Sequence, residues 1–259
     1  MQLMLNEYGS RAGIPLVLLH GFPMDSRVWQ PVVDQSSGRI ITADWAGFGR
    51  SSNNAPFTMQ SAAGELHRGL KEVGALPCVL CGLSMGGYLS LAFAAQFSTD
   101  LAGLILVDTK AAADEEQGKQ ARGQMIELAR SKGTPAVVEQ MLPKMFGTSV
   151  DPEAAESFRQ MMLESSPIAI EHATTAMRDR PDFTPVLREL KCPLLILVGE
   201  QDRITPPAIA IDMHRSHPGA EMIMLSGAGH MSPVEQPMQV AFAINFFRER
   251  RVRPAGHSH

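Results

Sequence analysis

Three side chains that lie far apart in the sequence could together carry out nucleophilic catalysis: Ser84, Asp202 and His230. A serine hydroxyl is a weak nucleophile by itself. It needs a base to accept its proton and a carboxylate to orient that base. Each of the three residues follows an apolar run that is typical of a buried strand: "CVLC" before Ser84, "LLILVG" before Asp202 and "AEMIML" before His230. We therefore expect all three to lie just beyond the ends of strands, where open α/β sheets gather their sites.

The segment around the serine is "CGLSMGGYL" (81–89), in which Gly82 and Gly86 flank Ser84 in the pattern G-x-S-x-G. Small residues are needed there because the serine sits in a strained turn between a strand and a helix, where the backbone approaches its neighbours closely. The pattern alone is weak, and a serine that merely fills a tight turn is the alternative. The strand before it and the apolar helical segment after it favour the nucleophile.

Short apolar runs alternate with helical segments along much of the chain. Most of the runs are continuous rather than alternating, as in strands that are buried on both faces of a parallel sheet. "MQLMLNEYG" at the start alternates better and predicts an antiparallel edge strand. This order predicts an α/β fold with a doubly wound, mostly parallel sheet. The remaining runs lie at 15–21, 39–47, 77–82, 101–109, 192–202 and 220–230, and the clearest helices at 61–74, 86–97 and 237–251.

Residues 110–190 interrupt this alternation. They contain no convincing buried strand and predict four helical segments, at 114–133, 134–147, 151–166 and 167–180. We interpret this stretch as a helical cap inserted into a core formed by residues 1–109 and 191–259. Many of the chain's methionines lie in the insert. Helically spaced methionine usually fills a core, although it also suits an adaptable apolar wall.

Composition excludes several classes of protein. The chain has 259 residues, 44% of them hydrophobic, and a formal charge of −4. The only basic cluster, "RERRVR" (248–253), fits the end of a last helix, so we expect no nucleic-acid partner. No apolar run approaches the ~20 residues of a membrane helix, and no targeting segment is evident, so we expect a cytoplasmic protein. Cys78 and Cys81 would point to opposite faces of one strand, which disfavours a redox or metal pair.

The chain resembles the α/β-hydrolase family. The residues that carry the resemblance follow one another in the family's order: "HGFP" (20–23), "DWAGFGRS" (44–51), "GLSMGG" (82–87), "GEQDRITPP" (199–207) and "GAGHMSPVEQP" (227–237). The family's triad also follows the chain order serine, acid, histidine. The resemblance implies that Ser84 is the nucleophile, His230 the base and Asp202 the acid. It further implies an oxyanion hole formed by the backbone N–H groups of Phe22 and Met85.

Some roles stay open at the sequence level. Asp108 is a rival acid because some family members place their acid after that strand, and Glu200 is a weaker rival. The resemblance implies that His20 shapes the oxyanion loop rather than acting as a base. Asp44 and Ser51 are expected to structure their loop. The residues that we expect to contact substrate are Trp45, Met141, Met145, Phe146 and Met231; for Trp45, plain packing is an equal alternative.

The resemblance implies a serine hydrolase that cleaves a small carboxylic ester or lactone without a cofactor or metal, working as a monomer or small homo-oligomer. Within the family, "DTKAAADEEQGKQAR" (108–122) and "AMRDRPDFTPVL" (176–187) are similar to small esterases and 3-oxoadipate enol-lactonase-type hydrolases. Two other classes stay open. One is a different reaction on the same triad, such as C–C bond hydrolysis, acyl transfer or perhydrolysis. The other is a ligand receptor of this fold that does not turn its ligand over.

Overall fold

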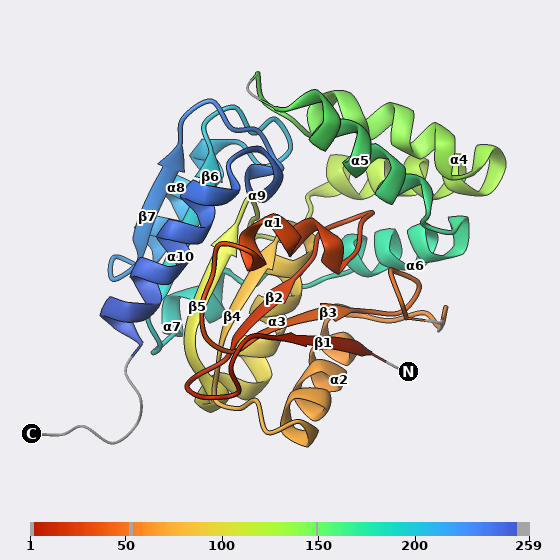
Figure 1. The fold of residues 1–259 in the computed structure, drawn as a ribbon. Coiled ribbons are helices and arrows are strands. Elements are labelled where there is room, and N and C mark those ends of the chain that lie inside the picture. Colours follow the sequence, from red (N-terminus) through yellow and green to blue (C-terminus); the bar gives the residue numbers. More distant parts are fainter. Residues whose placement is uncertain (1–2, 52–53, 149, 253–259) are drawn as a thin grey trace, which may run out of the picture.

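A seven-stranded, mostly parallel sheet forms the centre of the protein (Figure 1). The structure is a computed structural model and describes residues 3–51, 54–148 and 150–252. The sheet order is β1-β3-β2-β4-β5-β6-β7, and only the β1–β3 pair is antiparallel. This confirms the predicted doubly wound sheet and the edge strand at its start. The strands are β1 Met4–Tyr8, β2 Leu16–Leu19, β3 Ile40–Asp44, β4 Cys78–Leu83, β5 Leu101–Val107, β6 Leu194–Gly199 and β7 Glu221–Leu225.

The central strands are apolar on both faces because helices cover both faces. In β4, for example, Cys78 belongs to one hydrophobic cluster and Cys81 to the other, so the two thiols face opposite sides of the sheet as expected. The edge strand β7 differs: Ile223 is 37% exposed and Met224 41% exposed. Side chains at the edge of a sheet lack a neighbouring strand, and these two therefore stay partly in solvent.

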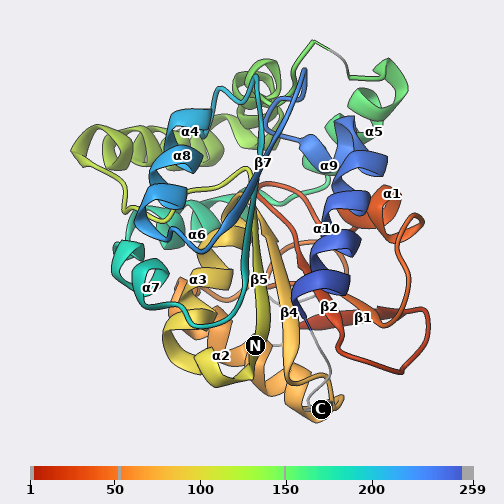
Figure 2. The ribbon, with the colours of Figure 1, turned by 90° about the vertical axis from the view of Figure 1, so that its left-hand side faces the viewer.

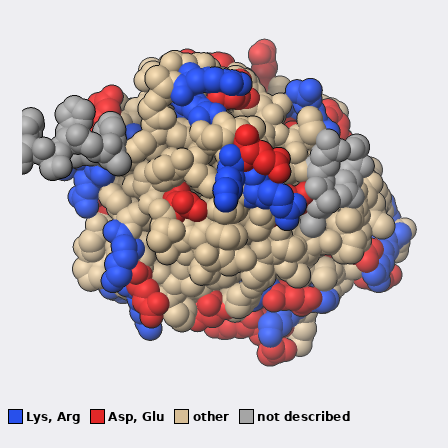
Figure 3. All heavy atoms as spheres, turned by 90° about the horizontal axis from the view of Figure 1, so that it is seen from below, with Lys and Arg blue, Asp and Glu red and all other residues tan. Residues whose placement is uncertain are grey.

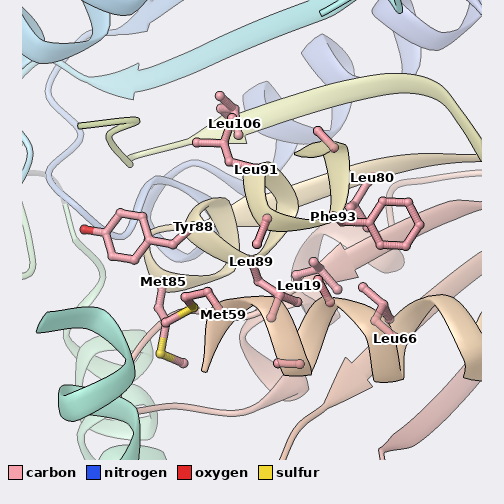
Figure 4. Close-up of a cluster of buried hydrophobic side chains, with 14 of the residues drawn as sticks. Leu19, Met59, Leu66, Leu80, Met85, Tyr88, Leu89, Leu91, Phe93 and Leu106 are labelled. Carbon is pink, nitrogen blue, oxygen red and sulfur yellow. The ribbon is translucent and has the colours of Figure 1, made fainter. Parts of the chain in front are cut away.

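One face is covered by α2 (Met59–Glu72), α3 (Met85–Phe97) and α8 (Pro207–Ser216), and the other by α1 (Gln30–Val33) and α10 (Pro237–Arg251) (Figure 2). The hydrophobic core between α2, α3 and the sheet is drawn in Figure 4. The helix α3 is apolar nearly all round, because it lies between the sheet on one side and α2 on another. Packing on these two sides holds the first turn of α3 in place and so fixes Ser84, the residue before it.

Between β5 and β6 the described chain is helical: α4 (Glu116–Met141), α5 (Pro152–Leu163), α6 (Pro167–Arg178) and α7 (Thr184–Glu189). The first predicted segment and the first part of the second, up to Met141, form one bent helix, α4, which is kinked at Gly133 where φ is 76°. Figures 1 and 2 place α4 and α5 at one end of the sheet. In contrast, α7 contacts α3 and α8 beside the sheet. We therefore propose that the cap consists of α4 to α6, and that α7 belongs with the core.

A buried ion cluster joins the two connections between this insert and the core. Asp114, in the connection that enters α4, lies 3.0 Å from Arg180, which follows α6. Lys110 and Arg122 are also paired with Asp114, at 2.7 and 3.1 Å. The Arg180 guanidinium lies 4.0 Å from the ring centroid of Tyr88 on α3. Removing one partner from such a buried pair typically costs about 3–5 kcal/mol, so the cluster fixes both connections to the core.

The surface carries charges of both signs without a large region of one sign on the face that Figure 3 shows. At the basic end of α10, Arg248 donates to Ser37 O and Ile14 O, Arg251 pairs with Glu221, and Arg250 lies over Phe246. The cluster's last residue, at position 253, lies outside the described residues. Within the described part of the chain, no helix is long and apolar enough to cross a membrane.

Candidate active site

Ser84 occupies the sharp turn between β4 and α3, with φ 52° and ψ −112°. Such a positive φ is rare for a residue with a side chain and is a local strain. The two flanking glycines allow it. A Cβ on Gly82 would lie 2.2 Å from Gly86 O, and a Cβ on Gly86 would lie 2.3 Å from Leu19 O. The G-x-S-x-G pattern therefore follows from the close approach of the backbone that presents the serine.

A chain of hydrogen bonds links the three predicted residues. Ser84 Oγ lies 2.9 Å from His230 Nε2, and His230 Nδ1 lies 2.8 Å from Asp202 Oδ2. A carboxylate can only accept, so Nδ1 carries the proton, and Nε2 is left to accept the serine proton. His230 is 2% and Asp202 4% exposed, whereas Ser84 is only half-buried. The geometry therefore allows Ser84 Oγ to pass its proton to His230 Nε2.

The Asp202 carboxylate is held by more than His230. Its Oδ1 accepts the N–H groups of Ile204 and Thr205 at 2.7 and 2.9 Å, and its Oδ2 accepts the Thr205 hydroxyl at 2.6 Å. Burial alone would raise the pKa of Asp202, but the bond and charge of His230 and the bonds of Thr205 outweigh it and lower the pKa below its ordinary value. The group is thus kept ionised, as a partner that stabilises an imidazolium must be.

The rival acid Asp108 is held by other groups. It lies at the end of β5 with φ 45°, fully buried, where it accepts the N–H of Gly199 at 2.8 Å and the N–H and hydroxyl of Ser232. Burial raises the pKa of Asp108 to about 7, and the charge of Asp202 adds to this rise. The weaker rival, Glu200, is exposed and accepts from Ser226 and Gly227. Of the three carboxylates, the structure places Asp202 on His230.

The loop after β2 packs directly against Ser84. A Cβ on Gly21 would lie 3.2 Å from Ser84 Cβ and 3.3 Å from Leu83 O, so a side chain at this position would crowd the serine turn. Neither Phe22 nor Met85 donates its N–H to a described residue. Met85 begins α3, where helix N–H groups lack a partner within the helix. Both N–H groups thus lack an acceptor among the described residues, and their role as oxyanion donors stays a prediction.

His20 supports this loop from below. Its Nδ1 lies 2.7 Å from Gly21 O, an acceptor, so this nitrogen carries the proton. The ring stacks on Trp45 at 4.0 Å between centroids. Burial lowers the pKa of His20, and the charge of Asp44 only partly opposes this. Asp44 itself accepts the N–H groups of Ser26 and Arg50 and so shapes its loop, as predicted.

The residues predicted to contact substrate are placed differently from one another. Trp45 is 3% exposed and packs in the core. Met145 and Met231 have no exposed surface. Met141 and Phe146 are half-buried, and Met141 lines a cavity of about 320 Å³ between α4 and the acid loop. A substrate contact stays a prediction for all five.

Three residues that support this site were not predicted from the sequence. Thr205 bonds Asp202, and Thr109 Oγ1 donates to Ser84 O at 2.7 Å. Glu235 accepts the N–H groups on both sides of His230. Burial raises the pKa of Glu235, although its three N–H bonds oppose this. For Glu235, the one signal in the sequence is the position of a carboxylate five residues after His230. Among the described residues, no group of three or more His, Cys, Asp or Glu side chains could hold a metal ion.

Comparison with known proteins agrees with this architecture. The model of the alpha/beta hydrolase family matches residues 16–244, which is most of the chain and includes all three residues of the hydrogen-bond chain. The chain belongs to the α/β-hydrolase family. This finding confirms the resemblance inferred from the five sequence segments, and it agrees with the observed sheet.

Several relatives of this α/β-hydrolase are ester-cleaving enzymes. A thermophilic esterase from Thermogutta terrifontis, solved with malate bound, is 36% identical, with a TM-score of 0.91, covering 97% of this chain and 94% of that one. Lipase 1 of Psychrobacter immobilis is 26% identical over 93% of this chain and 79% of the lipase. 3-Oxoadipate enol-lactonase 2 of Acinetobacter baylyi is 24% identical over 91% of this chain and 88% of the lactonase. The relatives thus support hydrolysis of esters as the general activity.

Proposed function

We propose that this protein is a serine hydrolase that cleaves a small carboxylic ester or lactone through an acyl-enzyme intermediate. The observation that carries the proposal is the hydrogen-bond chain from Ser84 through His230 to Asp202, with the serine on a strained turn. A serine in the same motif without such partners would be only a turn residue. Esterase, lipase and enol-lactonase relatives support the substrate class.

In the proposed first step, Ser84 Oγ attacks the carbonyl carbon while its proton passes to His230 Nε2. The imidazolium is stabilised by the ionised Asp202. The carbonyl oxygen becomes an oxyanion that accepts the N–H groups of Phe22 and Met85, each worth about 3 kcal/mol in the transition state. The C–O bond to the alcohol then breaks, and the leaving oxygen takes the proton from His230. The products are a free alcohol and an acyl ester on Ser84.

In the second step, His230 takes a proton from water as the water oxygen attacks the acyl carbon. The bond to Ser84 breaks, and Ser84 Oγ recovers its proton from His230. The acid product leaves and the enzyme returns to its starting state. A lactone follows the same course, except that its alcohol stays attached to the acid.

Serine in the turn disfavours the dehalogenase and epoxide-hydrolase branches of the family, which use an aspartate nucleophile there.

The test is a panel of p-nitrophenyl esters with graded acyl length, together with a panel of lactones. We expect the wild-type protein to hydrolyse members of at least one panel with a preference for small acyl groups. Ser84→Ala should lower kcat by at least about a thousandfold, because the nucleophile is lost while binding and the oxyanion donors remain. Inactivity of the wild type on both panels, or an unchanged rate in Ser84→Ala, would contradict the proposal.

A further inference from the structure

The segment between α4 and α5 is bonded to two of the three loops that carry the proposed catalytic side chains, the acid loop and the histidine loop. The Gly147 N–H donates to Glu235 Oε2 at 2.7 Å, and the next N–H, of Thr148, donates to Gln201 Oε1 at 2.9 Å. Gln201 directly precedes Asp202, and Glu235 ends the short helix α9 (Ser232–Glu235) that follows His230. Two adjacent backbone donors of the insert are thus shared between the acid loop and the histidine loop.

The other oxygen of Glu235 holds the histidine loop itself. Oε1 accepts the N–H of Gly229 at 2.9 Å and that of Met231 at 3.2 Å, so it bonds to the residues on both sides of His230. The Met231 N–H also lies 3.1 Å from Met145 O in the insert. The half-buried carboxylate therefore connects three backbone N–H groups, two beside the proposed base and one in the insert.

The backbones in this contact are too close for side chains. A Cβ on Gly147 would lie 2.4 Å from Gly227 O, and a Cβ on Gly229 would lie 2.3 Å from Gly147 N. Backbone packed directly on backbone leaves little room for one segment to move without the other. A displacement at Gly147 would therefore reach the histidine loop at Gly229, next to His230.

From these contacts we infer that Glu235 is a positioning residue that couples the placement of the helical insert to the placement of His230. Movement of the insert at Gly147 shifts the carboxylate, and the carboxylate shifts the two N–H groups that flank the imidazole. The inference deepens the proposed function and rests on it for its catalytic consequence. Glu235 touches no reacting atom and acts only through His230.

Glu235→Gln tests the coupling because the amide offers one acceptor oxygen in place of two. The NH₂ group replaces either Oε1, which accepts from Gly229 and Met231, or Oε2, which accepts from Gly147. In either orientation it faces an N–H donor, so either the bonds to the histidine loop or the bond to the insert are lost. Glu200→Gln is the matched control. This exposed carboxylate accepts from Ser226 Oγ and from the Gly227 N–H, in the loop that leads to His230. It bonds neither to the insert nor to the N–H groups beside His230. Both variants lose one negative charge.

For Glu235→Gln we expect kcat to fall about tenfold to a hundredfold with much less change in KM, because the base is misplaced after substrate has bound. Amide exchange over 145–148 should speed up by roughly tenfold. Glu200→Gln should keep the wild-type kcat, KM and amide exchange.

A wild-type kcat in a folded Glu235→Gln protein would overturn the inference. So would a loss of activity with unchanged amide exchange over 145–148, because the residue would then support the loop without coupling it to the insert. If Glu235→Gln does not fold, the same readouts apply to Glu235→Asp, whose shorter side chain cannot reach all three N–H groups. If the wild type cleaves no ester, the proposed function fails, but amide exchange over 145–148 in the two variants still decides the coupling.

Discussion

At the scale of single residues, two buried aspartates lie near one histidine, and the fold shifts their pKa values in opposite directions. Asp202 accepts from His230, Ile204 and Thr205, and these donors lower its pKa despite burial. Asp108 is fully buried, and its donors do not offset burial and the charge of Asp202, so its pKa is raised to about 7. Two carboxylates whose pKa values are shifted in opposite directions can take different roles. Asp202 can balance an imidazolium, and Asp108 can join the strand β6 to the histidine loop.

This difference predicts unequal effects of the same substitution. Asp202→Asn should lower kcat about 10³- to 10⁴-fold, because an amide at this position no longer fixes the proton on His230 Nδ1. Asp108→Asn should lower kcat less than about tenfold, because the amide oxygen can still accept the Gly199 N–H. Steady-state kinetics on one ester compares the two. A larger loss in Asp108→Asn would transfer the role of the acid to Asp108.

The raised pKa of Asp108 also predicts how stability depends on pH. Its pKa is 3.8 in the reference state and about 7 in the fold, so between these values the folded chain holds a proton that the unfolded chain has lost. Folding is then favoured by acid, and this contribution is lost as pH rises through about 7. Asp108→Asn removes the dependence. Relative to wild type, the variant should gain free energy of unfolding from pH 4 to 7 and level off above that.

Chemical denaturation of both proteins at several pH values measures this difference. A constant difference between pH 4 and 8 would show that Asp108 does not change its protonation on folding in that range. A difference that falls instead of rising would mean that its pKa is lowered by the fold, contrary to the burial that we describe.

At the scale of elements, the turn that presents Ser84 depends on glycine at positions with no room for a side chain. Gly86→Ala should destabilise the protein by about 1–3 kcal/mol or more, because the new Cβ would lie 2.3 Å from the backbone oxygen of Leu19. Gly64→Ala in α2 is the control, since nothing lies within 4 Å of its Cβ position. It should stabilise by about 0.5–1 kcal/mol. Equal free energies of unfolding for the two variants would contradict this account of the turn.

Many of the helices and strands could be predicted from sequence because they depend on local residue patterns. Continuous apolar runs predicted the strands of the sheet. The boundary between the first two predicted helical segments coincides with the kink in α4 at Gly133. The positions of Ser84, Asp202 and His230 after strands followed from the same patterns. What could not be predicted depends on contacts between distant segments. Examples are the burial of Met145 and Met231, and the bonds of Glu235 to Gly147.

At the scale of the whole molecule, the candidate site is assembled from loops that only the finished sheet brings together. Ser84 follows β4, Asp202 follows β6 and His230 follows β7, and the parallel arrangement puts all three loops at one edge. The insert then bonds to two of these loops through Gly147 and Thr148. The site therefore exists only in the folded chain, and its reactivity reports on the whole assembly.

The central claim is that Ser84 is a nucleophile activated by His230. Its most direct test is covalent labelling with a small fluorophosphonate, with the adduct located by mass spectrometry. We predict a single adduct on Ser84 in the wild type, and its loss in a folded His230→Ala variant, because the hydroxyl then has no base to take its proton. Labelling of a different residue, or labelling of Ser84 at an unchanged rate in His230→Ala, would contradict the account.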